Sequence, residues 1–269
     1  MKNIVLFDMD GTLTEPRKKI DRKIAMALHG LSQHTDVGIV TGSGLDYVLE
    51  QCSILWDKPE FFIGDKITLL PCNGTMAYTW QDNKWRMIFS RSIRQFLGKE
   101  RFRTLMKVLS GFHYNMLIRW ENSFPLTGHY ISLRSSLVNL CPCGRNALDA
   151  DREAFIKFDN LTECRKIEVE KLKNEFRING LNDLSVTLGG STSFDIYPIG
   201  WDKTFSLSHY TGHRQWFVGD RCEGYGNDRS IYELLAKENQ AFKTTGPEKT
   251  IEIIEGLIKI LKKGDDNVR

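Results

Sequence analysis

One stretch near the N-terminus constrains the fold of this chain most strongly. A continuous apolar run there stops abruptly at two carboxylates, a glycine and two hydroxyl residues, in the sequence IVLFDMDGTLT at positions 4–14. Such a run is typical of a fully buried strand of a parallel sheet. Open α/β sheets bind their ligands at the carboxyl ends of such strands. The stretch therefore predicts an α/β fold with a functional site directly after the first strand.

Asp8 and Asp10 are alternate residues after this strand, so their roles must differ. If Asp8 points into the site, it can bind a divalent cation and attack an electrophile, and Asp10 can act over the same reacting atom as an acid or base. Gly11 permits a sharp turn, and Thr12 can offer a hydroxyl or a backbone N–H to an anion. Solvated aspartates would explain a lone Asp-x-Asp, but the whole motif is far more specific.

A second apolar strand, residues 37–40, ends in the small and hydroxyl residues TGSG at positions 41–44 and leads into a helix. This order is typical of a phosphate site at a helix N-terminus. Thr41 and Ser43 are the two hydroxyl residues that could bind a phosphoryl group, and the pattern does not choose between them. An ordinary helix cap would also explain the Ser-Gly pair.

A third apolar strand, residues 215–219, ends at Asp220 and is followed seven residues later by Asn227 and Asp228. Carboxylates that converge without a cation would repel one another strongly. Because hard cations prefer oxygen ligands, we expect Mg²⁺ in this site. We expect Asp8, the backbone carbonyl of Asp10 and Asp220 to hold the ion, with Asn227 and Asp228 behind them.

Two basic residues flank this predicted site. Lys203 begins a helix of the core, where its ammonium group can neutralise Asp8 and a bound phosphate. Arg17 lies seven residues after Asp10, close enough to direct its guanidinium group at a phosphate. A solvated arginine in a basic run is an equally good interpretation of Arg17 from spacing alone.

The middle of the chain is predicted to be an α+β module inserted between two halves of the parallel-sheet core. Its expected boundaries give a core of residues 1–83 and 199–269 and a cap of residues 84–198. Short strands are expected within residues 59–88, including 61–63, followed by a helix over 92–109 and a strand over 115–120. Further elements are expected as strands at 130–134, 137–140, 184–188 and 194–197 and helices at about 149–158 and 163–178.

Three arginines in this module, Arg134, Arg145 and Arg152, fall within 19 positions. Several arginines on one module can hold a second phosphate away from the metal. Ser193 and Asp195 alternate on one face of a strand and could hydrogen-bond sugar hydroxyls. A solvated surface position would explain any one of these residues but explains the whole set poorly.

The motifs together resemble those of the haloacid-dehalogenase superfamily and, within it, the eukaryotic-type phosphomannomutases. The resemblance runs from the N-terminus to about residue 235. It rests on the DMDGTLT stretch and on Thr14-x-Pro16-Arg17, Asn73-Gly74, Asn139-x-x-Pro142-x-Gly144-Arg145, Gly189-Gly190-x-x-Ser193-Phe194-Asp195, Gly200-Trp201-Asp202-Lys203, and Gly219-Asp220 with Gly226-Asn227-Asp228.

The resemblance implies a Rossmann-like core with an inserted cap, Mg²⁺, and Asp8 as a nucleophile that becomes an aspartyl-phosphate. It implies Asp10 as general acid/base and substrate contacts from Arg17, Arg134, Arg145, Arg152, Ser193 and Asp195. In the superfamily a hydroxyl at Thr41 binds the phosphoryl group, whereas Ser43 matches the Gly-Gly-Ser of the phosphomannomutase branch. The implied reaction interconverts mannose 6-phosphate and mannose 1-phosphate with a hexose 1,6-bisphosphate as activator, a step in GDP-mannose biosynthesis.

Several departures from the family pattern weaken the inference to a mutase. The segment 73–134 is longer than in the family, Tyr225 precedes Gly226, Thr41 replaces a glycine, and residues 233–235 differ from the family's Thr-Asp-Pro. A Mg²⁺-dependent sugar-phosphate phosphatase on the same scaffold is therefore the alternative prediction. It differs only in whether water or a second sugar phosphate accepts the phosphoryl group.

Composition bounds the partners that we expect. The net charge of +3 is too small to indicate a nucleic-acid partner, and no apolar stretch approaches the roughly 20 residues of a membrane span. The six cysteines show no metal-binding spacing, which favours reduced thiols in a cytoplasmic protein. A small-molecule sugar phosphate is the expected partner. The resemblance also implies a homodimer that pairs through its caps.

Overall fold

The computed structural model describes residues 2–121 and 123–266, and the chain divides into two compact units. The first unit comprises Met1–Ser90 and Trp201–Arg269, and the second comprises Arg91–Gly200. The division after residue 90 differs from the expected one after residue 83, because β5 (Lys84–Ser90) pairs with β4 (Met76–Gln81) in the sheet of the first unit. The insertion thus begins after a complete hairpin.

A seven-stranded sheet organises the first unit in the order β11-β10-β1-β2-β3-β4-β5. Its first five strands are parallel, whereas β4 and β5 are antiparallel to their neighbours. Phe7 pairs with both Val218 and Ile39, so the strands that we expected to carry the site end at the same edge. The remaining strands are β1 (Asn3–Phe7), β2 (Asp36–Val40), β3 (Ile67–Leu70), β10 (Arg214–Gly219) and β11 (Ala241–Lys243).

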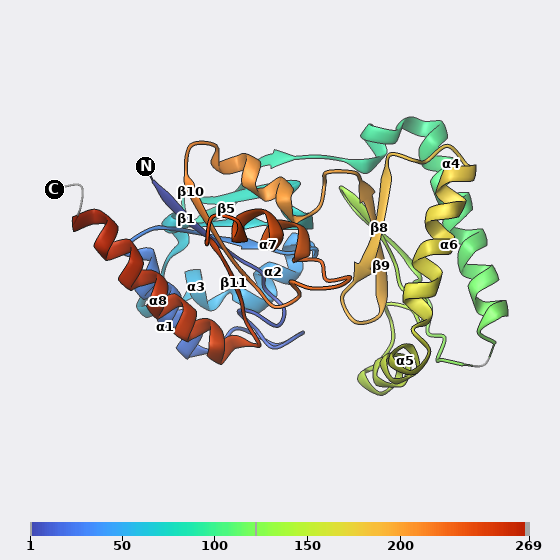
Figure 1. The fold of residues 1–269 in the computed structure, drawn as a ribbon, viewed down its shortest axis with the longest axis horizontal. Coiled ribbons are helices and arrows are strands. Elements are labelled where there is room, and N and C mark those ends of the chain that lie inside the picture. Colours follow the sequence, from blue (N-terminus) through green and yellow to red (C-terminus); the bar gives the residue numbers. More distant parts are fainter. Residues whose placement is uncertain (1, 122, 267–269) are drawn as a thin grey trace. The chain divides into compact units, whose positions relative to one another are not determined.

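Side chains of β1 alternate between two apolar cores. Val5 and Phe7 belong to the core beneath α1 (Arg22–Ser32), α2 (Leu45–Cys52), α3 (Ile54–Asp57) and α8 (Pro247–Asp266), whereas Ile4 and Leu6 belong to the core beneath α7 (Arg229–Ala236) and η4 (Lys203–Tyr210). Figure 1 shows α1 and α8 side by side along one face of the sheet. Burial on both faces explains why β1 is a continuous apolar run.

The second unit is a four-stranded antiparallel sheet packed against helices. Its strand order is β6-β7-β9-β8, with bounds β6 (Ile131–Arg134), β7 (Leu137–Leu140), β8 (Leu184–Gly189) and β9 (Ser193–Pro198). The helices α4 (Ile93–Arg119), α5 (Asp149–Thr162) and α6 (Cys164–Ile178) share one apolar core with this sheet. In Figure 1, α4 and α6 run beside each other next to the sheet.

A buried carboxylate joins α4 to α6. The side chain of Glu168 is inaccessible to solvent and accepts hydrogen bonds from Arg119 Nε at 3.0 Å, Trp120 Nε1 at 3.0 Å and Lys171 Nζ at 2.8 Å. Burial alone would raise the pKa of Glu168, but these hydrogen bonds outweigh it and hold the pKa below its ordinary value. Glu168 therefore stays ionised.

Two predicted strands are absent from the structure. Phe61 ends the one-turn helix η1 (Pro59–Phe61), which Pro59 begins because its ring presets a helical φ, and residues 62–63 have no regular secondary structure. Phe61 and Ile63 are buried, so their apolar character reflects the core and not strand pairing. Residues 115–120 mostly lie in α4, where Phe112 and Met116 continue the helical spacing of the buried face. Two further short helices are η2 (Gly64–Lys66) and η3 (Cys72–Gly74).

The six cysteines are free thiols, and each is buried. Within the described ranges of the chain, no helix combines the length and the apolar character that crossing a membrane requires.

Candidate active site

Asp8 lies at the carboxyl end of β1 and is 5% exposed. Its backbone N–H donates to the carbonyl of Val218 at 2.9 Å, which extends the pairing of β1 with β10 by one residue. The fully buried ammonium group of Lys203, at the start of η4, donates hydrogen bonds to carboxylate oxygens of both Asp8 and Asp228. This direct contact supports the prediction that Lys203 neutralises the charge of Asp8.

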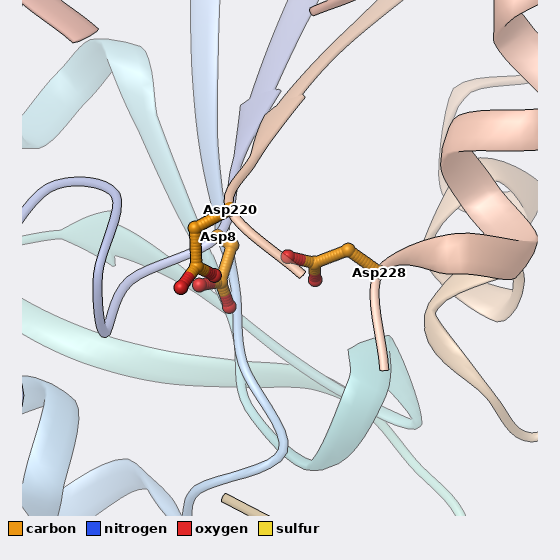
Figure 2. A group of neighbouring side chains, drawn as sticks. All are labelled: Asp8, Asp220 and Asp228. Atoms are coloured by element: carbon orange, nitrogen blue, oxygen red, sulfur yellow. The ribbon is translucent and has the colours of Figure 1, made fainter. Parts of the chain in front are cut away.

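Three carboxylates gather around this point. Oxygen atoms of Asp8, Asp220 and Asp228 all lie within 4.8 Å of one another. Figure 2 shows Asp8 and Asp220 together at the ends of neighbouring strands, with Asp228 directed at them from the start of α7. Gly11 lets the chain pass close by, because it has φ +87° and a Cβ atom here would meet Asp220 Oδ2 at 2.3 Å.

The site's electrostatics follow from burial and crowding. The pKa of Asp8 is raised well above its ordinary value, first by burial and then by the charge of Asp228, while Lys203 opposes the shift. The pKa of Asp220 is raised for the same two reasons. Burial alone would lower the pKa of Lys203, but the charges of Asp228 and Asp8 raise it. Lys203 is therefore an ammonium ion at any physiological pH.

The donor set fits a hard divalent cation. The ammonium of Lys203 hydrogen-bonds two of the three carboxylates, those of Asp8 and Asp228, and Oδ1 of Asp220 is buried without a hydrogen-bond partner among the described residues. Mg²⁺ prefers carboxylate oxygens and keeps some of its water. Both oxygens of Asp228 already accept hydrogen bonds, from Lys203 and from the backbone N–H of Arg221 at 3.0 Å. Asp8 and Asp220 are therefore the carboxylates better suited to hold the ion.

Asp10 does not point into this carboxylate group. Its Oδ1 accepts a hydrogen bond from the Tyr47 hydroxyl at 2.8 Å and another from the backbone N–H of Arg17 at 3.2 Å. Any role of Asp10 at the metal would therefore fall to its backbone carbonyl. Sequence reasoning missed Tyr47, since it lies 37 residues from Asp10 and no motif marks it. Arg17 itself is exposed, and what its guanidinium group binds stays a prediction.

The hydroxyl residues after β2 occupy the expected edge of the sheet. Thr41 is buried, and its Oγ1 accepts a hydrogen bond from the backbone N–H of Ser43 at 3.1 Å. Ser43 is half-buried, and its carbonyl accepts from the N–H of Cys72 at 2.9 Å. Both alternatives for the phosphoryl-binding hydroxyl remain open. Asn227 directly precedes Asp228 and is half-buried, and its part in binding the ion stays a prediction.

The second unit brings together the residues predicted to bind a second phosphate. Burial lowers the pKa of Arg145, and the positive charges of Arg134 and Arg152 lower it further, so each of these two guanidinium groups lies within electrostatic range of Arg145. Asp195 raises the same pKa, so its carboxylate also belongs to this cluster. The Asp195 carboxylate accepts a hydrogen bond from Asn139 Nδ2 at 2.7 Å.

Two further polar groups lie on the same sheet. Ser193 begins β9 and is almost fully buried. Oδ1 of Asn139 is buried and has no hydrogen-bond partner among the described residues. The Ser193 hydroxyl hydrogen-bonds the Cys141 thiol within this unit. The unpartnered carbonyl oxygen of Asn139 suits a ligand that brings a hydroxyl donor.

The model of one protein family, eukaryotic phosphomannomutase, matches residues 24–260 of this chain. The chain belongs to this family. Among the chain's relatives, a phosphomannomutase of Dendrobium officinale is 34% identical over 251 residues, which cover 93% of this chain and 91% of the relative. Phosphomannomutase 2 of Dictyostelium discoideum is 32% identical over 257 residues and covers 93% and 94%. The chain is thus an enzyme of the phosphomannomutase type.

Solved structures show the same fold at low identity. A haloacid dehalogenase-like hydrolase from Bacteroides thetaiotaomicron superimposes with a TM-score of 0.59 at 16% identity, over 96% of this chain and all of the hydrolase. A C-terminally truncated IMP-nucleotidase from Plasmodium falciparum gives a TM-score of 0.65 at 13% identity, over 97% and 72%. The predicted haloacid-dehalogenase-like fold is confirmed. At these identities the likeness concerns the fold alone.

Proposed function

We propose that this protein interconverts mannose 6-phosphate and mannose 1-phosphate through an aspartyl-phosphate on Asp8 and a hexose 1,6-bisphosphate. The carrying observation is the buried Asp8 at the end of β1, in contact with Lys203 and beside Asp220, in a chain of the phosphomannomutase family. A nucleophilic carboxylate needs a cation beside it when a phosphate approaches. Lys203 is that cation, held by two carboxylates and unable to leave.

The first half-reaction moves one phosphoryl group to the enzyme. A carboxylate oxygen of Asp8 attacks phosphorus, the bond from phosphorus to the sugar oxygen breaks, and Asp10 gives a proton to that oxygen. In the second half-reaction the hydroxyl of a sugar monophosphate attacks the phosphorus and returns a proton to Asp10, and Asp8 is regenerated. The two steps balance in protons and phosphoryl groups over one cycle.

Mg²⁺, held by Asp8, Asp220 and the carbonyl of Asp10, would neutralise negative charge on the transferring phosphoryl group. The chain's own groups carry the rest of the chemistry. Lys203 favours the ionised, nucleophilic form of Asp8 and opposes the burial and the charge of Asp228, which raise the pKa of Asp8. Asp228 holds Lys203 in place through its buried contact. A hydroxyl of Thr41 or Ser43 binds the phosphoryl oxygens.

The second unit supplies the site for the phosphate that does not react. Arg134, Arg145 and Arg152 are close enough to lower the pKa of Arg145, which costs free energy unless an anion joins them. A sugar phosphate brings that anion, and Asp195 with Ser193 meets its hydroxyls. A mutase must bind both ends of the sugar in turn, which gives a second phosphate site a purpose that simple hydrolysis would not require.

The test supplies mannose 1-phosphate with and without a hexose 1,6-bisphosphate, in Mg²⁺ buffer, and follows mannose 6-phosphate and inorganic phosphate separately. Formation of mannose 6-phosphate that depends on the bisphosphate supports the proposal. Release of inorganic phosphate with no isomerised sugar would instead establish a phosphatase. Asp8→Asn should give no phosphoenzyme on incubation with radiolabelled bisphosphate, and turnover retained in this variant would contradict the mechanism.

A further inference from the structure

The side chain of Asp10 is held by two donors that converge on one of its oxygens. The Tyr47 hydroxyl donates to Oδ1 at 2.8 Å, and the backbone N–H of Arg17 reaches the same oxygen at 3.2 Å. The Arg17 N–H also approaches the Tyr47 hydroxyl oxygen at 3.1 Å. The three groups thus form a closed triangle between the loop after β1 and the helix α2.

The direction of the Tyr47 proton is determined by this triangle. An ionised carboxylate can only accept hydrogen bonds, and a backbone N–H can only donate them. The Tyr47 O–H therefore points at Asp10, and its oxygen accepts from Arg17. Burial, and then the charge of Asp10, raise the pKa of Tyr47 well above its ordinary value, so the hydroxyl keeps this proton.

The backbone of Arg17 has an unusual conformation that allows the same contact. Arg17 has φ +64°, a left-handed conformation that costs a non-glycine residue about 1–2 kcal/mol. Such a conformation persists where its surroundings hold it, and it is found preferentially at functional sites. Here it aims the N–H at Asp10 and Tyr47. The strained backbone conformation of Arg17 thus helps to fix the orientation of the Asp10 carboxylate.

An aspartate without such contacts would not keep a single orientation. The terminal torsion of its side chain is broad and roughly two-fold, so its two oxygens exchange places easily. With Oδ1 occupied by two donors, only Oδ2 remains to exchange a proton with a substrate. A general acid/base needs its reacting atom within hydrogen-bond reach, and misplacement by about 1 Å can cost about 100-fold in rate.

We propose that Tyr47 is a positioning residue for phosphoryl transfer, whose hydroxyl locks Oδ1 of Asp10 so that Oδ2 delivers and recovers the proton on the sugar oxygen. This rests on the proposed acid/base role of Asp10. Tyr47 touches neither the substrate nor the reacting phosphorus. Its effect is therefore confined to steps in which a proton must move.

The test compares two phosphoryl donors in Tyr47→Phe. The phosphoryl group of mannose 1-phosphate reaches Asp8 from the 1,6-bisphosphate, and the sugar oxygen that leaves needs a proton. Para-nitrophenyl phosphate instead loses a phenolate that is stable without one. Tyr210→Phe is the matched control, because it removes another buried hydroxyl of the first unit that contacts none of the site residues. Thermal unfolding of each variant is recorded alongside the rates.

We expect Tyr47→Phe to lower kcat for mannose 1-phosphate about tenfold, the loss of about 1.4 kcal/mol that one hydrogen bond to a charged group can supply. KM for mannose 1-phosphate should stay within about twofold of wild type. So should the first-turnover burst of para-nitrophenol, which reports phosphorylation of Asp8 before any water must be deprotonated. Equal slowing with both donors would reduce Tyr47 to a structural residue and overturn the proposal. So would unchanged rates with both.

Failure of the proposed mutase function gives a different result from failure of the Tyr47 proposal. If the wild-type protein hydrolyses mannose 1-phosphate without isomerising it, the mutase proposal falls. The comparison of the two donors then still applies to hydrolysis, because the sugar oxygen needs its proton in that reaction too. Selective slowing of the sugar phosphate would support the role of Tyr47 in either enzyme.

Discussion

The ammonium group of Lys203 contacts the carboxylate of Asp8 although 195 positions of the chain separate the two residues. Water cannot take the place of either partner in this contact, since Lys203 is fully buried and Asp8 is only 5% exposed. Their contact joins the first strand to the segment that follows the inserted unit. The contact therefore couples the electrostatics of the site to the packing of the two segments that form the first unit.

Lys203→Met tests this dependence by keeping most of the side-chain volume while removing the charge. Without it, Asp8 and Asp228 are two buried carboxylates with no cation between them. We expect the free energy of unfolding in metal-free buffer to fall by about 3–5 kcal/mol, the cost of breaking a buried ion pair. Lys66→Met, at an exposed ion pair of 4.0 Å with Asp36, should change it by less than about 1 kcal/mol. Similar values for both variants would contradict the argument.

Gly11→Ala tests the metal site without removing a carboxylate. The new Cβ would lie 2.3 Å from Asp220 Oδ2 on a backbone of φ +87°, so Asp220 must move. We expect Mg²⁺ affinity, measured by calorimetric titration, to fall at least about tenfold, because Mg²⁺ tolerates little departure from its preferred geometry. Gly256→Ala in α8, where a Cβ meets nothing, should leave affinity unchanged and stabilise the fold by about 0.5–1 kcal/mol. Undiminished affinity in Gly11→Ala would exclude Asp220 as a ligand.

Arg145→Ala tests the second phosphate site. A hydrogen bond between charged groups contributes about 1.5–3 kcal/mol, so KM for mannose 1-phosphate should rise by at least about tenfold. Proton transfer at the sugar oxygen does not involve Arg145, so kcat should change less than KM. The control is Arg177→Ala at the exposed end of α6, which should alter neither constant. An unchanged KM in Arg145→Ala would show that the arginine cluster binds something else.

Glu168→Gln tests a predicted pH dependence of the stability of the second unit. The folded protein holds the pKa of Glu168 below its unfolded value of about 4.5, so the ionised carboxylate stabilises the fold above that pH. The contribution is lost as the pH falls through the folded-state pKa. We expect Glu168→Gln to be about 1–3 kcal/mol less stable at neutral pH, by urea unfolding. The difference should shrink as the pH falls below about 4.5, and a difference that stays constant on acidification would refute the assignment.

Local patterns predicted the parts of the fold that sequence periodicity encodes. The buried strands ending at Asp8, Thr41 and Asp220 appear where their apolar runs stop, because burial on both faces of a parallel sheet removes any alternation. The same patterns failed at residues 61–63 and 115–120. Apolar residues there are buried for tertiary reasons, and a short apolar run does not distinguish a strand from a buried turn or helix.

The candidate site divides in the same way. The chain's own motifs identified Asp8, Lys203, Asp220 and Asp228 because strand ends and helix starts carry recognisable residues, and the structure brings these four together. Tyr47 carried no signal. The contact between Tyr47 and Asp10 arises only because α2 packs beside the loop that contains Asp10, so it cannot be inferred from the sequence.

By itself, the sequence determined the fold class, the nucleophile candidate and the charges of the groups around it, because these depend on residue type and local periodicity. Only the tertiary structure decided which oxygen of each carboxylate is already occupied, that Asp228 is held by Lys203, and that Asp10 faces Tyr47. Hydrogen bonds are directional and reach only about 3 Å. Their partners follow from three-dimensional packing and not from separation along the chain.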